Sequence, residues 1–107
     1  MAEYLTVLTT TDTPDKAHTL ATGAVESRVA ACAQIDGPVT SVYRWEGEIR
    51  SDQEWRILFK TTAERYAALE TYIQTVHDYD TPEIIATPVV RGSGAYLAWV
   101  SGETAEG

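Results

Sequence analysis

The sequence predicts an α+β fold of the ferredoxin-like type: a split β-α-β sandwich, in which an antiparallel sheet carries two helices on one face, plus a short C-terminal helix. Two observations support this prediction. Stretches with strand and helix patterns follow one another in the order β, α, β, β, α, β, and only a turn separates the two central strand stretches. At 107 residues the chain is long enough for one domain, 1–107, with one core.

The first two elements are a strand and a helix. Residues 3–10 alternate and are rich in Thr, Val, Leu and Tyr, with no Gly or Pro, which is typical of a strand. Thr13 followed by Pro14 indicates a helix N-cap and first helical position. Small apolar residues then recur at helical spacing, which predicts a helix over residues 14–29 that packs closely on a sheet.

The next two elements predict a hairpin. Residues 32–45 are β-rich, and Pro38 inside them indicates a bulge or an edge strand. Residues 46–53 are expected to form the turn. Residues 54–60 alternate apolar and charged side chains, apart from Leu58, which is the pattern of a strand with one buried face.

The last third of the chain predicts a helix, a strand and another helix. Thr61 and Glu64 have the spacing of a capping box, and apolar residues then repeat at helical spacing to about His77. Residues 83–90 are expected to form a core strand, and residues 95–101 a short helix. The remaining residues, 102–107, are expected to be a disordered tail.

Composition excludes several classes of function. The net charge of −8 would repel a phosphate backbone, so we expect no nucleic-acid partner. No apolar run is long enough to span a membrane, and the first residues lack the pattern of a signal peptide. A single cysteine, Cys32, agrees with a reducing compartment, so we expect a cytoplasmic protein.

Aromatic side chains on the strands indicate self-association. The strands offer Tyr43, Trp45, Trp55 and Phe59, whereas two helices can cover only one face of the sheet. Large exposed apolar patches on small domains usually mark interfaces. We therefore expect a homo-oligomer.

The stretch HDYDTPE, residues 77–83, brings several possible metal ligands together. An imidazole such as His77 and a thiolate such as Cys32 suit copper or zinc, and Asp80 and Glu83 could add carboxylate oxygens. Structural roles are the alternatives: a helix end for His77, a buried apolar site for Cys32, and loop chemistry for Asp80. Glu83 could instead pair with Lys60.

Five strings together resemble the CutA family, the divalent-cation tolerance proteins. They are AACAQI, SVYRWEGEI, LFKTT, HDYDTPEII and YLAWV, which occur in the family's order and spacing between residues 4 and 100. The resemblance implies a ferredoxin-like subunit in a tight homotrimer, with the long hairpin contributing to contacts between subunits. It also implies a link to copper and other divalent cations.

The resemblance also carries over individual residues: Cys32, Tyr43, Trp45, Glu46, Lys60, His77, Tyr79, Pro82, Glu83 and Trp99. The candidate metal ligands are Cys32, His77, Asp80 and Glu83. A cleft between subunits is expected to involve Tyr43, Trp45, Lys60, Tyr79 and Trp99. This chain has Asp78 where the family commonly has proline after the histidine.

The preferred hypothesis is a cytoplasmic trimer that binds copper or similar metal ions and is not an enzyme, since motifs for nucleotide-dependent or metalloprotease chemistry are missing. One alternative is a small-molecule-sensing module, similar in architecture to the nitrogen-regulatory signalling trimers. Another is a trimeric scaffold whose metal binding is adventitious.

Overall fold

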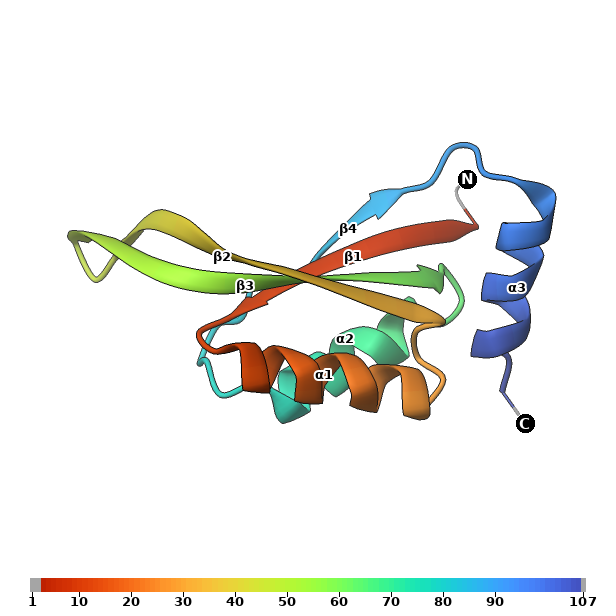
Figure 1. Cartoon of the computed structure of the whole chain (residues 1–107), viewed down its shortest axis with the longest axis horizontal. Helices are drawn as coiled ribbons and strands as arrows, with labels where there is room; N and C mark the ends of the chain where they lie inside the picture. The colour runs from red at the N-terminus through yellow and green to blue at the C-terminus, as the bar shows by residue number, and fades with distance from the viewer. Residues whose placement is uncertain (1–2, 107) are drawn as a thin grey trace.

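A computed structural model describes residues 3–106 and shows a four-stranded antiparallel sheet with two helices on one face (Figure 1). The strands are β1 (Tyr4–Thr11), β2 (Cys32–Trp45), β3 (Glu48–Thr62) and β4 (Ile85–Pro88), in the order β2-β3-β1-β4. The helices are α1 (Pro14–Glu26), α2 (Tyr66–Val76) and α3 (Gly94–Thr104). The predicted split β-α-β order and the α+β class are therefore confirmed.

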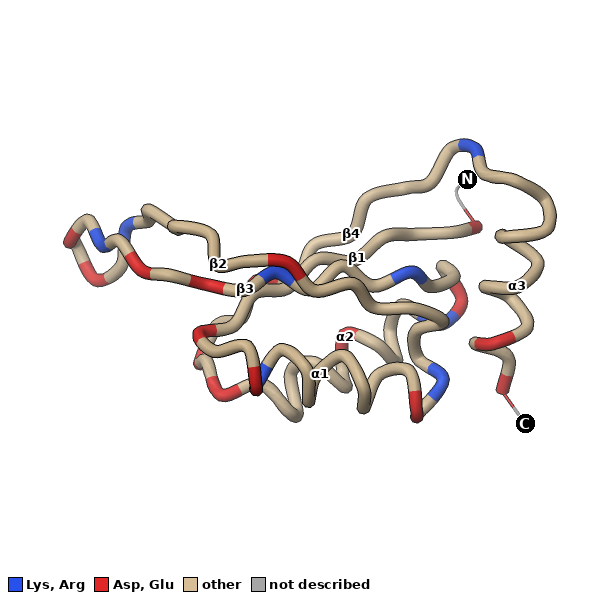
Figure 2. Tube along the Cα trace, viewed as in Figure 1, with Lys and Arg blue, Asp and Glu red and all other residues tan. Residues whose placement is uncertain are grey.

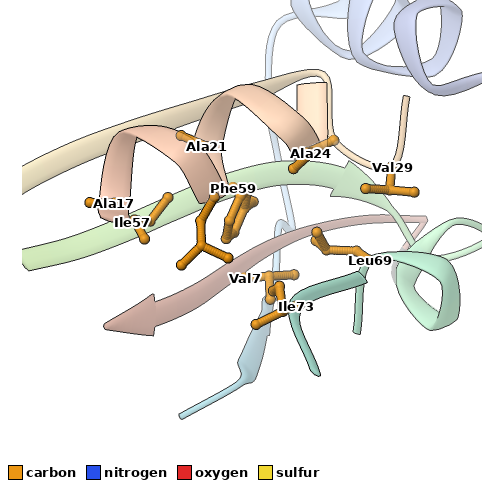
Figure 3. Close-up of a cluster of buried hydrophobic side chains, with 11 residues drawn as sticks. Val7, Ala17, Ala21, Ala24, Val29, Ile57, Phe59, Leu69 and Ile73 are labelled. Atoms are coloured by element: carbon orange, nitrogen blue, oxygen red, sulfur yellow. The ribbon is translucent and has the colours of Figure 1, made fainter. Parts of the chain in front are cut away.

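The core lies between the sheet and helices α1 and α2 (Figure 3). Alanines along α1 let its backbone approach β3, where Ile57 and Phe59 are fully buried. Val7 of β1 and Leu69 and Ile73 of α2 complete the centre of this cluster. The alternation expected for residues 54–60 is confirmed, because Ile57 and Phe59 face the helices.

Helix α1 begins as expected but ends earlier than predicted. The Thr13 side chain accepts a hydrogen bond from the Lys16 amide at 3.1 Å, as an N-cap should. The helix ends at Glu26 instead of residue 29, since Arg28 adopts a left-handed backbone conformation with φ 62°. Such a residue just beyond the last turn stops helical hydrogen bonding.

The hairpin between β2 and β3 is tighter than the sequence suggested. The predicted turn of residues 46–53 is wrong, because only Glu46 and Gly47 form it and β3 begins at Glu48. Both turn residues have positive φ, 51° and 80°, which matches the twist of paired strands. The predicted irregularity near Pro38 is confirmed as a register shift between Asp36 and Val39 in an edge strand.

The predicted capping box before α2 is wrong. Thr61 is the fully buried, penultimate residue of β3, and its hydroxyl donates to the Val29 carbonyl at 2.8 Å. Helix α2 starts five residues later, at Tyr66, without a side-chain cap. A Thr-x-x-Glu pattern cannot distinguish a cap from the buried end of a strand.

The C-terminal elements also differ from their expected lengths. Strand β4 is shorter than residues 83–90, because its pairing with β1 ends near the beginning of that strand. Helix α3 extends to Thr104, which is buried and donates its hydroxyl to the Val100 carbonyl at 2.8 Å. The expected disordered tail is therefore helical over residues 102–104, and residue 107 lies outside the described part.

The outer half of the β2–β3 hairpin projects beyond the helices, and we call residues 39–53 the arm (Figure 1). It carries both acidic and basic residues (Figure 2). On one of its faces Val42 and Ile49 are 68% and 65% exposed. The arm thus leaves apolar side chains in solvent.

The core makes a direct prediction. Replacing Phe59 by Ala should lower the free energy of unfolding by about 3–5 kcal/mol, because it removes a fully buried ring and leaves a cavity. Urea denaturation followed by circular dichroism measures this. Val90→Ala is the control at a highly exposed position, and an equal effect of both changes would contradict the described core.

Candidate functional site

A solvent-open groove of about 560 Å³ lies where the arm meets the loop after α2. Three aromatic rings, three carboxylates, one guanidinium and several hydroxyl groups are among its lining groups. The lining residues are Thr10, Ser41, Val42, Tyr43, Trp45, Arg50, Glu54, Tyr79, Asp80, Thr81 and Glu83. Its volume falls in the range of small-molecule sites.

The register of the hairpin explains why one wall of the groove is aromatic and charged. Tyr43 lies opposite Arg50 across the two strands. Glu54 follows Arg50 by four residues along β3, so strand alternation places it on the same face. The odd-numbered neighbours Ile57 and Phe59 face the helices instead. The groove therefore lies on the face of the sheet opposite α1 and α2.

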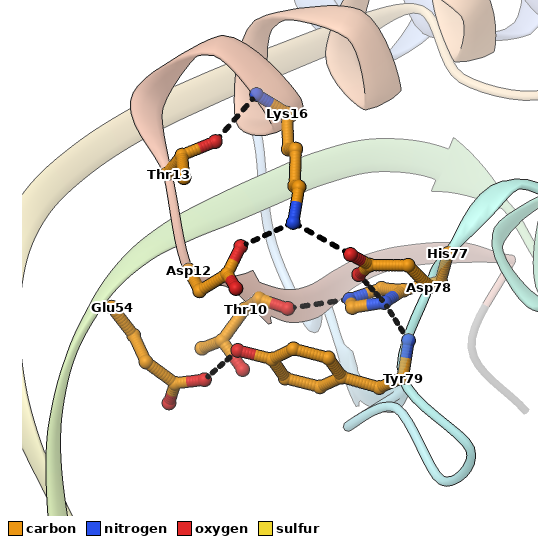
Figure 4. Close-up of polar contacts among 8 residues, drawn as sticks. All are labelled: Thr10, Asp12, Thr13, Lys16, Glu54, His77, Asp78 and Tyr79. Atoms are coloured by element: carbon orange, nitrogen blue, oxygen red, sulfur yellow. Dashed lines mark hydrogen bonds and ion pairs between the residues drawn. The ribbon is translucent and has the colours of Figure 1, made fainter.

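The other wall is the loop of residues 79–83, which a hydrogen bond fastens to strand β3. The Tyr79 hydroxyl donates to a Glu54 carboxylate oxygen at 2.8 Å (Figure 4). Burial, together with that neighbouring carboxylate, raises the pKa of Tyr79. The Tyr79 hydroxyl therefore stays protonated at neutral pH and keeps this bond as a donor.

A second tyrosine is fastened in a similar way. The Tyr43 hydroxyl donates to the Asp52 carboxylate on the neighbouring strand. That hydrogen bond raises the pKa of Tyr43. Both hydroxyl groups are thus engaged, and the Tyr79 ring also packs on His77 at a centroid distance of 4.5 Å.

His77 holds the start of this loop and is not free to bind a metal. Its side chain is fully buried, and Nε2 lies 2.6 Å from the Thr10 carbonyl oxygen (Figure 4). Its Nδ1 lies 3.1 Å from the Tyr79 amide nitrogen. A carbonyl only accepts and an amide N–H only donates, so the ring is neutral with its proton on Nε2. Both nitrogens are already used.

An ion-pair cluster lies beside His77 on the surface. The Lys16 ammonium contacts Asp12 at 2.9 Å and Asp78 at 2.6 Å, which links the start of α1 to the segment after α2 (Figure 4). The hydrogen bond from Lys16 lowers the pKa of Asp78. Asp78, which replaces the proline common in the resembling family, thus acts as an exposed structural partner.

Cys32 lies elsewhere on the sheet. It begins β2, pairs with Lys60 in register, and is half-buried near Tyr96 of α3. Burial, together with the neighbouring thiol, raises the pKa of Tyr96. Across residues 3–106, no group of three or more His, Cys, Asp or Glu side chains is arranged to hold a metal ion. The four candidate ligands therefore do not converge within one chain.

The other candidate residues divide between two places. Tyr43, Trp45, Tyr79, Asp80 and Glu83 line the groove within one chain. Lys60 and Trp99 are not among its lining residues. Lys60 donates to the Gln34 side chain at 2.7 Å, and Trp99 packs against Tyr96 at a centroid distance of 5.5 Å.

The expected pairing of Lys60 with Glu83 is not found among the described residues. The Glu83 carboxylate acts instead on Arg56. The pKa of Arg56 is raised mainly by its 2.5 Å hydrogen bond to Asp36, and the negative charge of Glu83 raises it further. Glu83 therefore lies nearer to Arg56 and lines the groove.

Two charged groove residues, Arg50 and Glu54, are missing from the sequence predictions. Their position depends on the register of the hairpin, and a turn predicted over residues 46–53 does not give that register. The Glu46-Gly47 pair was the available signal, because a two-residue turn there sets Tyr43 opposite Arg50.

Fold and groove together define a class: a small α+β ferredoxin-like protein with an acidic, aromatic groove beside a long exposed hairpin. The family profile described as CutA1 divalent ion tolerance protein matches residues 5–103. The chain belongs to this family. A divalent-cation tolerance protein CutA of Thermus thermophilus is 41% identical over 92% of this chain and 95% of its own length.

Solved structures show the same relationship. The Thermus thermophilus divalent cation tolerance protein superposes with a TM-score of 0.93 at 39% identity, covering 95% of this chain and 99% of that one. CutA from Synechococcus elongatus has a TM-score of 0.92 at 37% identity, covering 98% and 93%. A CutA from Archaeoglobus fulgidus, at 29% identity over 95% and 99%, with a TM-score of 0.92, is described as periplasmic.

None of the helices within residues 3–106 has the apolar length needed to cross a membrane.

The bonds of His77 lead to a prediction about stability. His77→Phe should lower the free energy of unfolding by about 1–3 kcal/mol, because it leaves the buried Thr10 carbonyl without a donor. Chemical denaturation measures the change. His18→Phe, on the exposed side of α1, is the matched control. Equal stability of wild type and His77→Phe would show that the hydrogen bonds of the imidazole nitrogens do not stabilise the fold.

Proposed function

We propose that this protein contributes to divalent-cation tolerance as a cytoplasmic homotrimer that binds metal ions and is not an enzyme. Its relatives are named divalent-cation tolerance proteins. The observation that supports binding is the groove, where the carboxylates of Glu54, Asp80 and Glu83 line one open space. The lone cysteine supports a reducing compartment.

The arm supports self-association. A two-stranded hairpin is marginally stable in water on its own, and this one exposes Val42 and Ile49 on a single face. A second copy of the chain would remove both side chains from solvent. Three copies are proposed because the family resemblance implies a trimer.

Assembly can be tested by sedimentation equilibrium. Wild type should have three times the 11.8 kDa chain mass, whereas Val42→Asp with Ile49→Asp should shift the protein to monomer, since the new charges would be buried at the interface. Val90→Asp, at an exposed position outside the arm, should leave the trimer intact. A monomeric wild type, or a trimeric double variant, would contradict the proposal.

Metal binding is proposed at the groove carboxylates. His77 has no free nitrogen and Cys32 lies outside the groove, so Asp80 and Glu83 are the stronger candidates within one chain. Carboxylate oxygens bind divalent cations, and copper would need a nitrogen or sulfur donor as well. In a trimer a neighbouring copy would supply the remaining ligands, and Cys32 is the soft donor available.

Calorimetric titration with Cu²⁺ and Zn²⁺ tests this proposal. Asp80→Asn with Glu83→Gln should weaken binding by about tenfold or more, because two anionic ligands become neutral. Asp15→Asn with Glu26→Gln makes the same charge change on exposed positions of α1 and should preserve affinity. Absence of saturable binding to wild type, or equal binding by both double variants, would refute it.

A second candidate function is the binding of a small organic molecule, as a sensing module would require. The observation in its favour is the volume and aromatic lining of the groove. Stabilisation of the protein by an organic compound in the presence of a chelator would separate this function from metal binding.

A further inference from the structure

We infer that the groove is a binding site for a small organic ammonium ion with an apolar body. This inference rests on the second candidate function and specifies its ligand class. It is supported by three features of the groove: its charge balance, its aromatic surfaces and its size.

The charge of the groove favours a cation. Glu54, Asp80 and Glu83 bring three carboxylates, and Arg50 is the one cationic residue among the described residues that line it. Glu54 already accepts the Tyr79 hydroxyl, and Glu83 is close enough to Arg56 to raise the pKa of that guanidinium. Asp80 has no side-chain bond among the described contacts and is the acceptor most available to an ammonium group.

The aromatic residues favour an organic cation over a bare metal ion. Tyr43, Trp45 and Tyr79 line the same space as the carboxylates. Tyr79 packs on the His77 ring at a centroid distance of 4.5 Å, whereas Tyr43 and Trp45 are 40% and 41% exposed and offer the more open ring surfaces. The negative face of an aromatic ring attracts an ammonium group, and the ring covers apolar carbon at the same time. A phosphate or carboxylate ligand would meet three like charges.

The size and setting of the groove agree with this ligand class. About 560 Å³ exceeds what a single metal ion fills and suits a compound of modest size. Hydroxyl groups of Thr10, Ser41 and Thr81 add further polar lining. One wall belongs to the hairpin and the other to the loop anchored by His77, so both walls are fixed by hydrogen bonds.

The probe is a matched pair of compounds: isopentylammonium, which is charged, and isopentanol, which is neutral and nearly isosteric. Each is titrated into ¹⁵N-labelled, assembled wild-type protein in buffer with EDTA, and amide and indole resonances are followed by NMR. Isopentylammonium should shift the Trp45 indole and the amides of residues 79–81 in a saturable manner. The affinity for isopentanol should be lower by about fivefold or more.

Two variants test the location. Trp45→Leu should weaken isopentylammonium binding about fivefold, whereas Trp99→Leu, which removes a similarly exposed tryptophan packed on Tyr96, should not change it. Asp80→Asn should weaken isopentylammonium but not isopentanol. Circular dichroism and sedimentation confirm that each variant folds and assembles as wild type does.

Several outcomes would overturn the inference: no saturable shift, equal affinity for the two compounds, shifts centred on Trp99, or equal loss in both tryptophan variants. The result is independent of metal binding because EDTA is present. If isopentylammonium binds while Cu²⁺ and Zn²⁺ do not, the metal proposal alone fails, and the reverse pattern removes only this inference.

Discussion

The pairing of β2 with β3 is the constraint on which the rest of the structure depends. It runs from Cys32 opposite Lys60 to Trp45 opposite Glu48. At its inner end alternate residues such as Phe59 are buried beneath the helices, which creates the core. At its outer end the same ladder continues past the helices and becomes the arm, where Val42 and Ile49 stay exposed among the residues that the structure describes.

The groove follows from the same pairing together with one buried hydrogen-bonded ring. Strand alternation places Tyr43, Arg50 and Glu54 on the face away from the helices. His77 then fixes the opposite wall, because it joins the Thr10 carbonyl of β1 to the Tyr79 amide of the loop. His77, a candidate metal ligand in the sequence, thus supports one wall of the groove through both ring nitrogens.

The chain belongs to the CutA1 divalent ion tolerance family, and the structure separates the groups that could act as metal ligands. The thiol and the imidazole are kept apart, with Cys32 near α3 and His77 under the loop. The carboxylates, in contrast, are gathered beside aromatic rings.

The sequence by itself determined the element types, their order and the α+β class, because periodicity and caps such as Thr13 are local properties. Through the family resemblance it also singled out Tyr43 and Tyr79 as candidates for a cleft between subunits and Glu83 as a candidate metal ligand. It could not place Glu54, whose role depends on the register of the hairpin. Nor could it distinguish a capping Thr61 from a buried one.

The tertiary structure alone decided the role of His77. Its hydrogen-bond partner, Thr10, is 67 residues earlier in the chain, and no local pattern reports that contact. The same holds for the separation of Cys32 from the groove, because it depends on how β2 pairs and where α3 packs. Local forces select helices and strands, whereas side-chain roles are fixed by contacts between residues distant in sequence.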